Sequence, residues 1–370
     1  DGKFEEISRK SLEAASWLIQ PNKTVLPFGD SPPDDILRRA NFPVNMENLS
    51  PSPPFGLKYF EKSGLCISSS SNKDGESSEY FAISGSFFSR QHKHADDMGF
   101  QYFSGGKGIF TDAGTFSYIY DSEERIFVES TRAHNCLEID GKDYSRFSSE
   151  IFGNCLEIVC EIGSAIILEG VLKRKRLVPA DLPYNKIKSH ETESVMVEHR
   201  RLVYYVPKKF LVIQDRLDSD KERDYTQWFN FFPNLETTID GGEVIVSDPE
   251  EVLAVMRVDI EEPVITKHRG EEEPRLQGWV SSNGHTLEKS DSIGIRTRGK
   301  KAVISTMIDV DFGSTKKFST NISSEGKYIR ITVLREDGKY DLKIRNKGEK
   351  ITIEHDENGN SESIEISIID

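Results

Sequence analysis

The sequence predicts an all-β protein, a large antiparallel β-sandwich of stacked sheets, preceded by a single helix. From Phe55 onward the chain is a series of short apolar or alternating runs, separated by glycine, asparagine, aspartate and serine. This pattern is typical of strands that are joined by turns. Because no segment with a helical period separates the runs, we expect antiparallel pairing and not strand–helix–strand units.

The one helical segment comes first, over residues 3–20. Its apolar side chains recur at three-to-four spacing. They are Phe4, Ile7, Leu12, Ala15, Leu18 and Ile19. Pro21 ends the run, because proline cannot continue a helix. Residues 21–55 are rich in proline, aspartate, asparagine and serine, and they predict a linker with one short helix over residues 34–39.

The expected strands follow from the linker to the end of the chain. They span residues 64–68, 80–88, 98–103, 156–162, 165–172, 195–206, 210–217, 225–232, 252–258, 302–308, 328–334, 340–344, 351–353 and 364–369. Pro207, Lys208 and Lys209 separate two strong strands. Since proline pre-sets the backbone for a turn, these three residues predict a hairpin, with both lysines in solvent.

Composition excludes two classes of function. The 370 residues carry a formal net charge of −14, and their basic cluster is confined to residues 173–176. We therefore expect no nucleic-acid binding, which requires a broad basic face. No apolar run approaches the roughly 18 residues of a membrane helix, so we expect no membrane span. Cys155 and Cys160 should face opposite sides of one strand, and the free thiols that result favour a reducing compartment such as the cytoplasm.

The densest chemistry lies between Ser89 and Tyr144. Three of the eight histidines, His92, His94 and His134, fall in this window together with Asp112. Two imidazoles and a carboxylate are ligands that borderline cations such as Zn²⁺ prefer. The remaining histidine would then be free for proton chemistry. If His92 and His94 lie on one strand, their side chains leave the same face.

Four ordered motifs fill this window. They are His92-Lys93-His94-Ala95-Asp96, Phe110-Thr111-Asp112-Ala113-Gly114-Thr115-Phe116-Ser117-Tyr118, Ser130-Thr131-Arg132-Ala133-His134-Asn135 and Asp140-Gly141. Together they resemble the C-terminal β domain of the heparinase II/III-like polysaccharide lyases, which include oligoalginate lyases. Weaker matches are Gly29-Asp30-Ser31, His199-Arg200-Arg201, residues 212–216 and Gly278-Trp279, whereas residues beyond about 310 carry no motif of the family.

The resemblance implies three segments. Residues 1–25 would be the last helix of an upstream helical toroid, residues 26–55 a linker, and residues 56–370 the β-sandwich domain. The toroid itself has no counterpart in this sequence, so the resemblance implies an upstream helical domain of the same protein as a partner. It leaves a homodimer open. It also implies a bacterial protein of the periplasm or the extracellular space, in contrast to the compartment that free thiols favour.

The resemblance further implies β-elimination of an acidic polysaccharide that contains uronic acid, such as a glycosaminoglycan, alginate or a capsular polymer. A base removes the C5 proton of the uronate, and an acid protonates the leaving oxygen at C4. His92 matches the family's catalytic histidine. Imidazole suits the role of the base because its ordinary pKa lies near working pH. Tyr118 and Tyr120 are the candidate tyrosines. The alternatives are a solvated surface position for His92 and core or rim packing for the tyrosines.

The family's metal ligands match His94, Asp112 and His134. The implied cofactor is a divalent metal, in the first place Zn²⁺, with the structural role of holding the segments that present His92 and Arg132. Two alternatives stay open. The three side chains can form a hydrogen-bonded cluster without metal, or they can bind Mn²⁺ or another ion.

Four further residues are expected to bind the substrate: Arg132, Asn135, His199 and Arg201. Arg132 suits a sugar carboxylate or sulfate, because a guanidinium binds such groups with two parallel hydrogen bonds. An internal ion pair with Glu129 or Asp140 is the alternative. For His199 and Arg201 we expect a place in the lining of a cleft.

The expected function is that of a polysaccharide lyase, a carbon–oxygen lyase that is incomplete without the helical domain. In the family that domain supplies an asparagine or histidine, which neutralises the substrate carboxylate, and a catalytic tyrosine. A non-catalytic carbohydrate-binding or scaffold module stays open as an alternative. A metal-dependent enzyme of cupin type is a third hypothesis.

Overall fold

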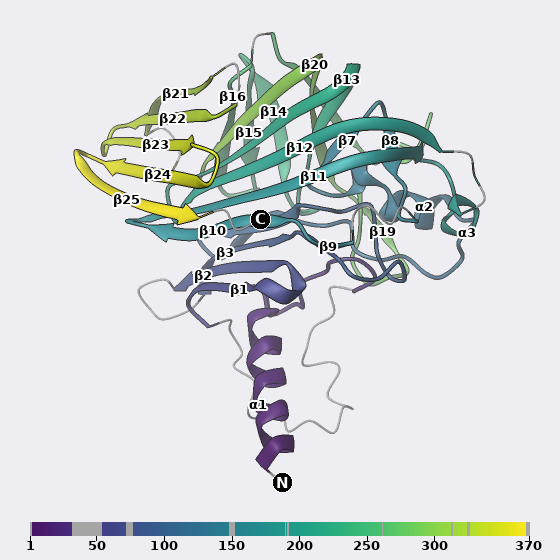
Figure 1. The fold of residues 1–370 in the computed structure, drawn as a ribbon. Coiled ribbons are helices and arrows are strands. Elements are labelled where there is room, and N and C mark those ends of the chain that lie inside the picture. Colours follow the sequence, from purple (N-terminus) through teal and green to yellow (C-terminus); the bar gives the residue numbers. More distant parts are fainter. Residues whose placement is uncertain are drawn as a thin grey trace.

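The computed structural model describes residues 2–31, 54–71, 77–147, 152–188, 190, 192–260, 262–311, 314–323 and 326–367. Within them, three antiparallel sheets lie in layers and one helix, α1 (Gly2–Trp17), projects from the first layer (Figure 1). The fold class predicted from the sequence is therefore confirmed. The expected helix at residues 34–39 and most of the expected linker lie outside the described residues.

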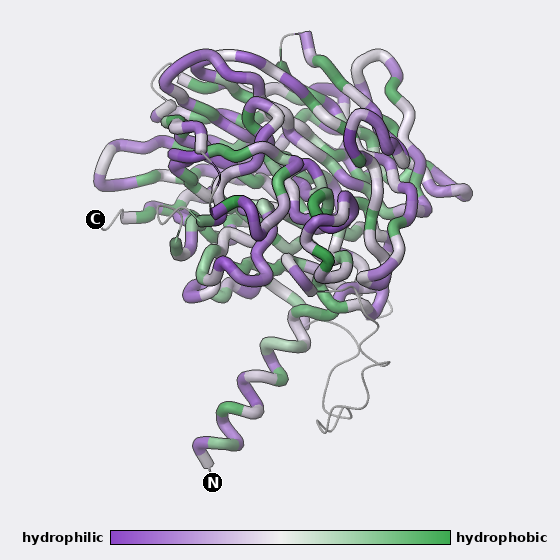
Figure 2. Tube along the Cα trace, turned by 90° about the vertical axis from the view of Figure 1, so that its right-hand side faces the viewer, coloured by the Kyte–Doolittle hydropathy of each residue, from purple (hydrophilic) through white to green (hydrophobic). Residues whose placement is uncertain are grey.

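The first layer is a five-stranded sheet in the order β1-β2-β3-β5-β6. Its strands are β1 (Gly56–Phe60), β2 (Leu65–Ser71), β3 (Ser77–Ser84), β5 (Gly99–Ser104) and β6 (Lys107–Phe110). Only the last turn of α1 rests on this sheet, where Trp17 packs with Tyr80 and Phe103. The rest of the helix points away from the body (Figure 2), and on it Phe4 is 74% exposed and Ile7 is 55% exposed. As expected for a lone helix, α1 has little to pack against.

The middle layer is an eleven-stranded sheet. Its strands are β7 (Leu137–Ile139), β8 (Lys142–Tyr144), β10 (Leu156–Ile162), β11 (Ala165–Pro179), β12 (Glu193–Val206), β13 (Phe210–Asn230), β14 (Glu236–Asp240), β15 (Glu243–Ser247), β16 (Val252–Val258), β17 (Val264–Arg269) and β20 (Asp291–Asp309). The hairpin predicted at Pro207 joins β12 to β13. The two strands expected over 210–217 and 225–232 are one strand, β13, because its polar middle stays paired with β20 around a β-bulge.

The third layer is a five-stranded sheet in sequence order. Its strands are β21 (Thr315–Ile322), β22 (Tyr328–Arg335), β23 (Lys339–Asn346), β24 (Lys350–Glu357) and β25 (Asn360–Ser367). Two small sheets pair β4 (Ser86–Phe87) with β9 (Gly153–Asn154) and β18 (Trp279–Ser281) with β19 (Leu287–Lys289). The short helices α2 (Glu123–Glu129) and α3 (Tyr184–Ile187) were not predicted. No helix among the described residues has the length and apolar character to cross a membrane.

Alternation along β11 explains why the middle sheet carries a layer on each face. Ile166 and Leu168 lie in the core shared with the first sheet, whereas Ile167 lies in the core shared with the third. Successive side chains of a strand point to opposite faces, so an unbroken apolar run is buried on both sides. Cys155 and Cys160 also pack against opposite cores, and all four cysteines are free, as predicted.

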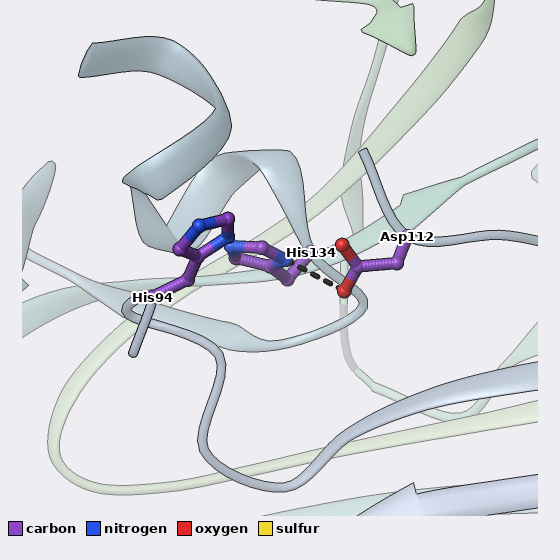
Figure 3. Close-up of side chains that lie close together, drawn as sticks. All are labelled: His94, Asp112 and His134. Atoms are coloured by element: carbon purple, nitrogen blue, oxygen red, sulfur yellow. Dashed lines mark hydrogen bonds and ion pairs between the residues drawn. The ribbon is translucent and has the colours of Figure 1, made fainter. Parts of the chain in front are cut away.

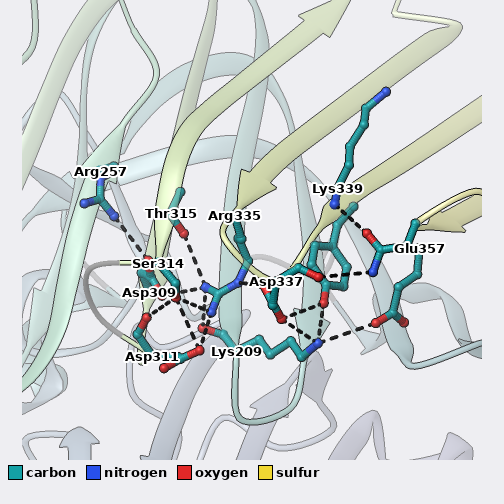
Figure 4. A network of polar contacts seen from close by, with 12 residues as sticks. Lys209, Arg257, Asp309, Asp311, Ser314, Thr315, Arg335, Asp337, Lys339 and Glu357 are labelled. Atoms are coloured by element: carbon teal, nitrogen blue, oxygen red, sulfur yellow. Dashed lines mark hydrogen bonds and ion pairs between the residues drawn. The ribbon is translucent and has the colours of Figure 1, made fainter.

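A polar network attaches the third sheet to the middle one (Figure 4). The side chain of Arg335, at the end of β22, is 0% exposed and pairs with Asp309 of β20 at 2.7 Å, with Asp311 at 2.6 Å and with Asp337 at 3.0 Å. Lys209 of the hairpin turn pairs with Asp337 at 2.8 Å, so this lysine is engaged in an ion pair and not simply solvated. Because water is excluded from Arg335, its charge depends on these carboxylates, and removal of the guanidinium would weaken the pairing of the buried Asp309.

Candidate active site

His92 and His94 lie in the loop between β4 and β5 and not on one strand, so the condition under which they would share a face is not met. The side chain of His92 is 65% exposed, whereas that of His94 is 0% exposed. His92 has a φ of 62°, a left-handed conformation that is uncommon outside glycine. Lys93 between them is ion-paired with Asp96 and Asp97. These two ion pairs hold the loop.

His94, Asp112 and His134 come together from three segments (Figure 3). Asp112 follows β6, and His134 follows the 3-10 helix η3 (Thr131–Ala133). His134 Nδ1 lies 2.7 Å from Asp112 Oδ2, and the two imidazole ring centroids are 5.4 Å apart. All three residues are buried, and one candidate ligand atom of each lies within 4.8 Å of the others. The side chains that the motifs single out thus form one compact cluster.

Two nitrogens of this cluster, His94 Nδ1 and His134 Nε2, are buried and have no hydrogen-bond partner among the described residues. A buried polar atom without a partner costs free energy, and a bound cation would remove that cost. Two imidazoles and a carboxylate suit a borderline divalent ion. Burial lowers the pKa of His134, but the carboxylates of Asp112 and Asp96 together raise it by more, so the net shift is upward. The donor set therefore fits a divalent metal.

The residue that joins the two loop histidines is Asp30, which the sequence analysis did not assign to the site. Its Oδ2 lies 2.8 Å from His92 Nδ1, and its Oδ1 lies 2.9 Å from His94 Nε2. Arg125 of α2 pairs with the same carboxylate at 2.7 Å. Burial raises the pKa of Asp30, but the hydrogen bonds from His94 and Arg125 lower it by more than burial raises it. The net shift is downward, so the carboxylate stays ionised. Its one sequence signal was the short match at residues 29–31.

Gly29 allows Asp30 to approach the loop. Its φ is +59°, and a Cβ at this position would lie 2.4 Å from the carbonyl oxygen of His92. The backbone N–H of Asp30 donates to that same carbonyl oxygen at 3.2 Å. Glycine meets both requirements, because it adopts a positive φ without strain and has no side chain to collide.

Tyr118 and Tyr120 lie on the surface and not in the core. Tyr118 is 58% exposed and Tyr120 is 37% exposed. The ring of Tyr118 meets the ring of His92 edge to face, with centroids 6.2 Å apart. The guanidinium of Arg125 lies 5.3 Å from the Tyr118 ring and 5.8 Å from the Tyr120 ring. An exposed phenol thus stands next to the exposed histidine.

Arg132 and Asn135 are buried, which does not fit the substrate contact expected of them. Arg132 is 2% exposed and donates to two backbone carbonyl oxygens, and burial lowers its pKa to about 10. Its expected alternative partners, Glu129 and Asp140, pair with other arginines. Asn135 is 1% exposed, and its side chain makes three hydrogen bonds to backbone groups. Both side chains hold the segments around His134 in place.

His199 and Arg201 also occupy buried positions, on β12, where they do not line a cleft. Arg201 binds Asp215 of β13 with two hydrogen bonds of 2.8 Å and 2.7 Å, and His199 Nε2 lies 2.7 Å from the same carboxylate. Arg201 also donates to the carbonyl oxygens of Met98 and Asn135 at 2.8 Å and 2.6 Å. The pair therefore anchors the histidine-bearing segments to the middle sheet.

Comparison with known proteins places this geometry in context. A profile of the family "Heparinase II/III-like, C-terminal" matches residues 52–332. Two heparinase III structures superpose with TM-scores of 0.68 and 0.64 at 16% and 17% identity, and each match covers 100% of this chain. Heparan sulfate lyase HepC from Pedobacter heparinus superposes over 95% of this chain with a TM-score of 0.62 and 15% identity. No curated protein sequence matches the chain.

The chain spans about half the length of these solved structures, since the matches cover 53%, 55% and 51% of them. At this identity the superposition shows the shared fold, and it gives no support to a homodimer. The family itself is shown by the profile, which covers the first two layers and reaches into β22. The chain belongs to the heparinase II/III-like family, and it carries that family's C-terminal domain.

Proposed function

We propose that this chain is the C-terminal part of a polysaccharide lyase that cleaves a uronic-acid-containing polymer by β-elimination. The observation that carries the proposal is the position of Asp30 between an exposed histidine, His92, and a buried one, His94. One of the proteins with this fold is named as a lyase of heparan sulfate, which agrees with a polymeric, acidic substrate.

His92 is the base that takes the C5 proton. In the neutral tautomer with hydrogen on Nδ1, His92 donates to Asp30, and the lone pair on Nε2 is left to accept a proton. The side chain is 65% exposed, so a polymer can reach it. A histidine is suited to this step because its ordinary pKa lies close to neutral pH.

Tyr118 and Tyr120 are the candidates for proton donation to the leaving oxygen at C4. The edge-to-face contact of Tyr118 with His92 supports this role, because a sugar that reacts at His92 would also lie close to this phenol. Tyr120 lies farther along the surface and is suited to contact a neighbouring sugar of the polymer. Both remain candidates beside the tyrosine that the upstream helical domain would supply.

His94, Asp112 and His134 would hold a divalent metal, and Zn²⁺ is our first choice for this ligand set. The ion would balance the charge of Asp112 and fix the orientation of the imidazoles, which is a structural role. His94 would then act twice, because its Nε2 side contacts Asp30 while its Nδ1 side faces the cluster. Asp30 would then be an outer-shell carboxylate, a group that orients the ligands of a metal site.

The upstream helical domain completes the proposed active site. Residues 1–25 would be its last helix, residues 26–55 the linker and residues 56–370 the β domain. Arg125, whose guanidinium lies 5.3 Å from the Tyr118 ring, is already paired with Asp30 and Glu129. Neutralisation of the substrate carboxylate is therefore assigned to the upstream domain, and we expect the isolated chain to be weakly active or inactive.

The test is the ultraviolet absorbance of the unsaturated uronate that β-elimination creates. The full-length protein would be incubated with heparan sulfate, chondroitin, hyaluronan, alginate and bacterial capsular polymers. We expect a rise with one polymer that disappears in His92→Ala, while His285→Ala, an exposed histidine outside the site, keeps it. No rise with any polymer, in a folded protein that still binds one of them, would point instead to a carbohydrate-binding module.

A further inference from the structure

A strip of aromatic rings leads away from the site across the surface. Beyond Tyr118, the ring of Tyr120 stacks on that of Tyr184 with centroids 5.8 Å apart and an interplanar angle of 29°. Tyr184 contacts Phe147 in turn, at 5.3 Å. These rings come from the loop after β6, from α3 and from the turn after β8. Segments far apart in the sequence thus build one continuous surface.

Arg90 stands at the end of this strip. Its guanidinium lies 6.0 Å from the Phe147 ring, and its backbone carbonyl accepts a hydrogen bond of 2.9 Å from the hydroxyl of Tyr184. The residue is exposed. Among the described residues its guanidinium has no ion pair and no hydrogen bond. Arg90 is also only two positions before His92 in the same loop.

The other two arginines that touch the strip differ from Arg90. Arg125 and Arg146 are each 2% exposed, and both pair with Glu129, at 2.6 Å and 2.9 Å. Arg125 also pairs with Asp30. Their charges are therefore neutralised by carboxylates within the protein. Among the residues that the structure describes, Arg90 is the one arginine of the strip without a carboxylate partner, so it can bind an acidic group that arrives from solvent.

Rings and a free guanidinium together match the two parts of an acidic sugar. The C–H face of a pyranose ring packs against the face of an aromatic ring, and a guanidinium binds a carboxylate or sulfate with two parallel hydrogen bonds. Tyr120 and Tyr184 are partly exposed residues and are the candidates for the first contact. Arg90 provides the second contact. A neutral sugar would use only the rings.

We propose that Arg90, Tyr120, Tyr184 and Phe147 form a second sugar subsite, which binds a carboxylate- or sulfate-bearing residue near the sugar that reacts at His92. The inference rests on the proposed function, and it narrows the substrate to polymers with an acidic group on a nearby residue as well. Arg90 is a specificity residue here, because it lies apart from the reacting atoms.

The kinetic test uses the full-length protein and the polymer that it cleaves. Arg90→Ala should raise KM about tenfold or more, because the substrate loses one hydrogen-bonded ion pair. The value of kcat should stay unchanged. Arg90→Lys should recover part of the loss, because lysine keeps the charge but lacks the two-pronged guanidinium. The matched control is Arg298→Ala on β20, an exposed arginine far from the strip with a weak ion pair of 3.8 Å.

A binding measurement separates this inference from the proposed function. Calorimetry would follow an acidic tetrasaccharide of each polymer in the panel, and its carboxyl-reduced, desulfated form, on His92→Ala with and without Arg90→Ala. Tighter binding of the acidic form that Arg90→Ala abolishes supports the subsite, even if no elimination is detected. Elimination by the wild type with the same KM in Arg90→Ala overturns the subsite and leaves the lyase intact. Failure of every acidic tetrasaccharide to bind overturns it as well.

Discussion

Asp30 Oδ2 lies 2.8 Å from Nδ1 of His92, a residue 62 positions later in the chain. The other oxygen of the same carboxylate meets His94. The exposed histidine and the buried cluster are therefore connected through one side chain. A change at Asp30 should affect the orientation of both histidines.

Asp30→Asn tests this connection. The amide keeps the size of the carboxylate but loses its charge and cannot accept hydrogen bonds on both atoms. We expect kcat for polymer cleavage to fall roughly 10–100-fold, as for other residues that orient a site from outside it, with a small change in KM. Asp248→Asn is the control, because Asp248 pairs with Lys107 on another part of the surface. An unchanged kcat in Asp30→Asn would contradict the orienting role.

Gly29→Ala tests the close approach of the Asp30 segment to the histidine loop. The new Cβ would lie 2.4 Å from the His92 carbonyl oxygen, so the segment must move and take Asp30 with it. Gly241→Ala is matched, since its φ of +55° is similar and nothing lies within 4 Å of its Cβ. Both should lose about 1–2 kcal/mol of unfolding free energy from the positive φ. Lyase activity should fall only in Gly29→Ala, and equal activity in the two variants would count against the contact.

Metal removal tests the buried cluster. We expect the wild type to retain about one equivalent of divalent metal, measured by elemental analysis, and His94→Ala to lose it. At an ion concentration of about 100 times Kd, the bound ion adds roughly 2.7 kcal/mol to the unfolding free energy, so chelation should lower Tm. His285→Ala should keep both metal and Tm. A wild type without bound metal, whose Tm is insensitive to added Zn²⁺ and Mn²⁺, would favour the metal-free cluster.

Arg335→Ala tests the attachment of the third sheet. Removal of this buried guanidinium takes from Asp309 its 2.7 Å partner and leaves the 3.3 Å pair with Arg257. We therefore expect a loss toward the lower end of the about 3–5 kcal/mol that loss of one member of a buried ion pair typically costs. Arg345→Ala removes a partly exposed pair with Glu354 from the same sheet, which should cost about 1 kcal/mol or less. Urea unfolding followed by circular dichroism measures both. Similar losses in the two variants would show that burial of Arg335 is not the deciding factor.

Strand positions were predictable where side chains alternate or form apolar runs. The segments 156–162 and 252–258 have the same bounds in sequence and structure, as β10 and β16. The prediction failed in the polar middle of β13 and in the first half of β20, where pairing between the two strands outweighs local pattern. The short helices α2 and α3 were missed because neither is long enough for a helical period.

The cluster of His94, Asp112 and His134 was predictable because its members belong to ordered motifs, whereas the burial and pairing of the arginines were not. Arg201 faces Asp215 across β12 and β13, and only the register of these strands reveals that the guanidinium is neutralised and buried. Asp30 was missed for a related reason. It lies 62 residues from His92, and no local pattern indicates which distant side chain a carboxylate meets.

The double covering of the middle sheet has a consequence for motion. The central strands β11, β12 and β13 have packed cores on both faces and neighbours on both sides. Their amide hydrogens can therefore exchange with heavy water only through large openings, which require most of the global unfolding free energy. Arg201 ties the backbone at Met98 and Asn135 to this slowest-exchanging region. The exposed imidazole of His92 can thus face solvent while the frame behind it hardly opens.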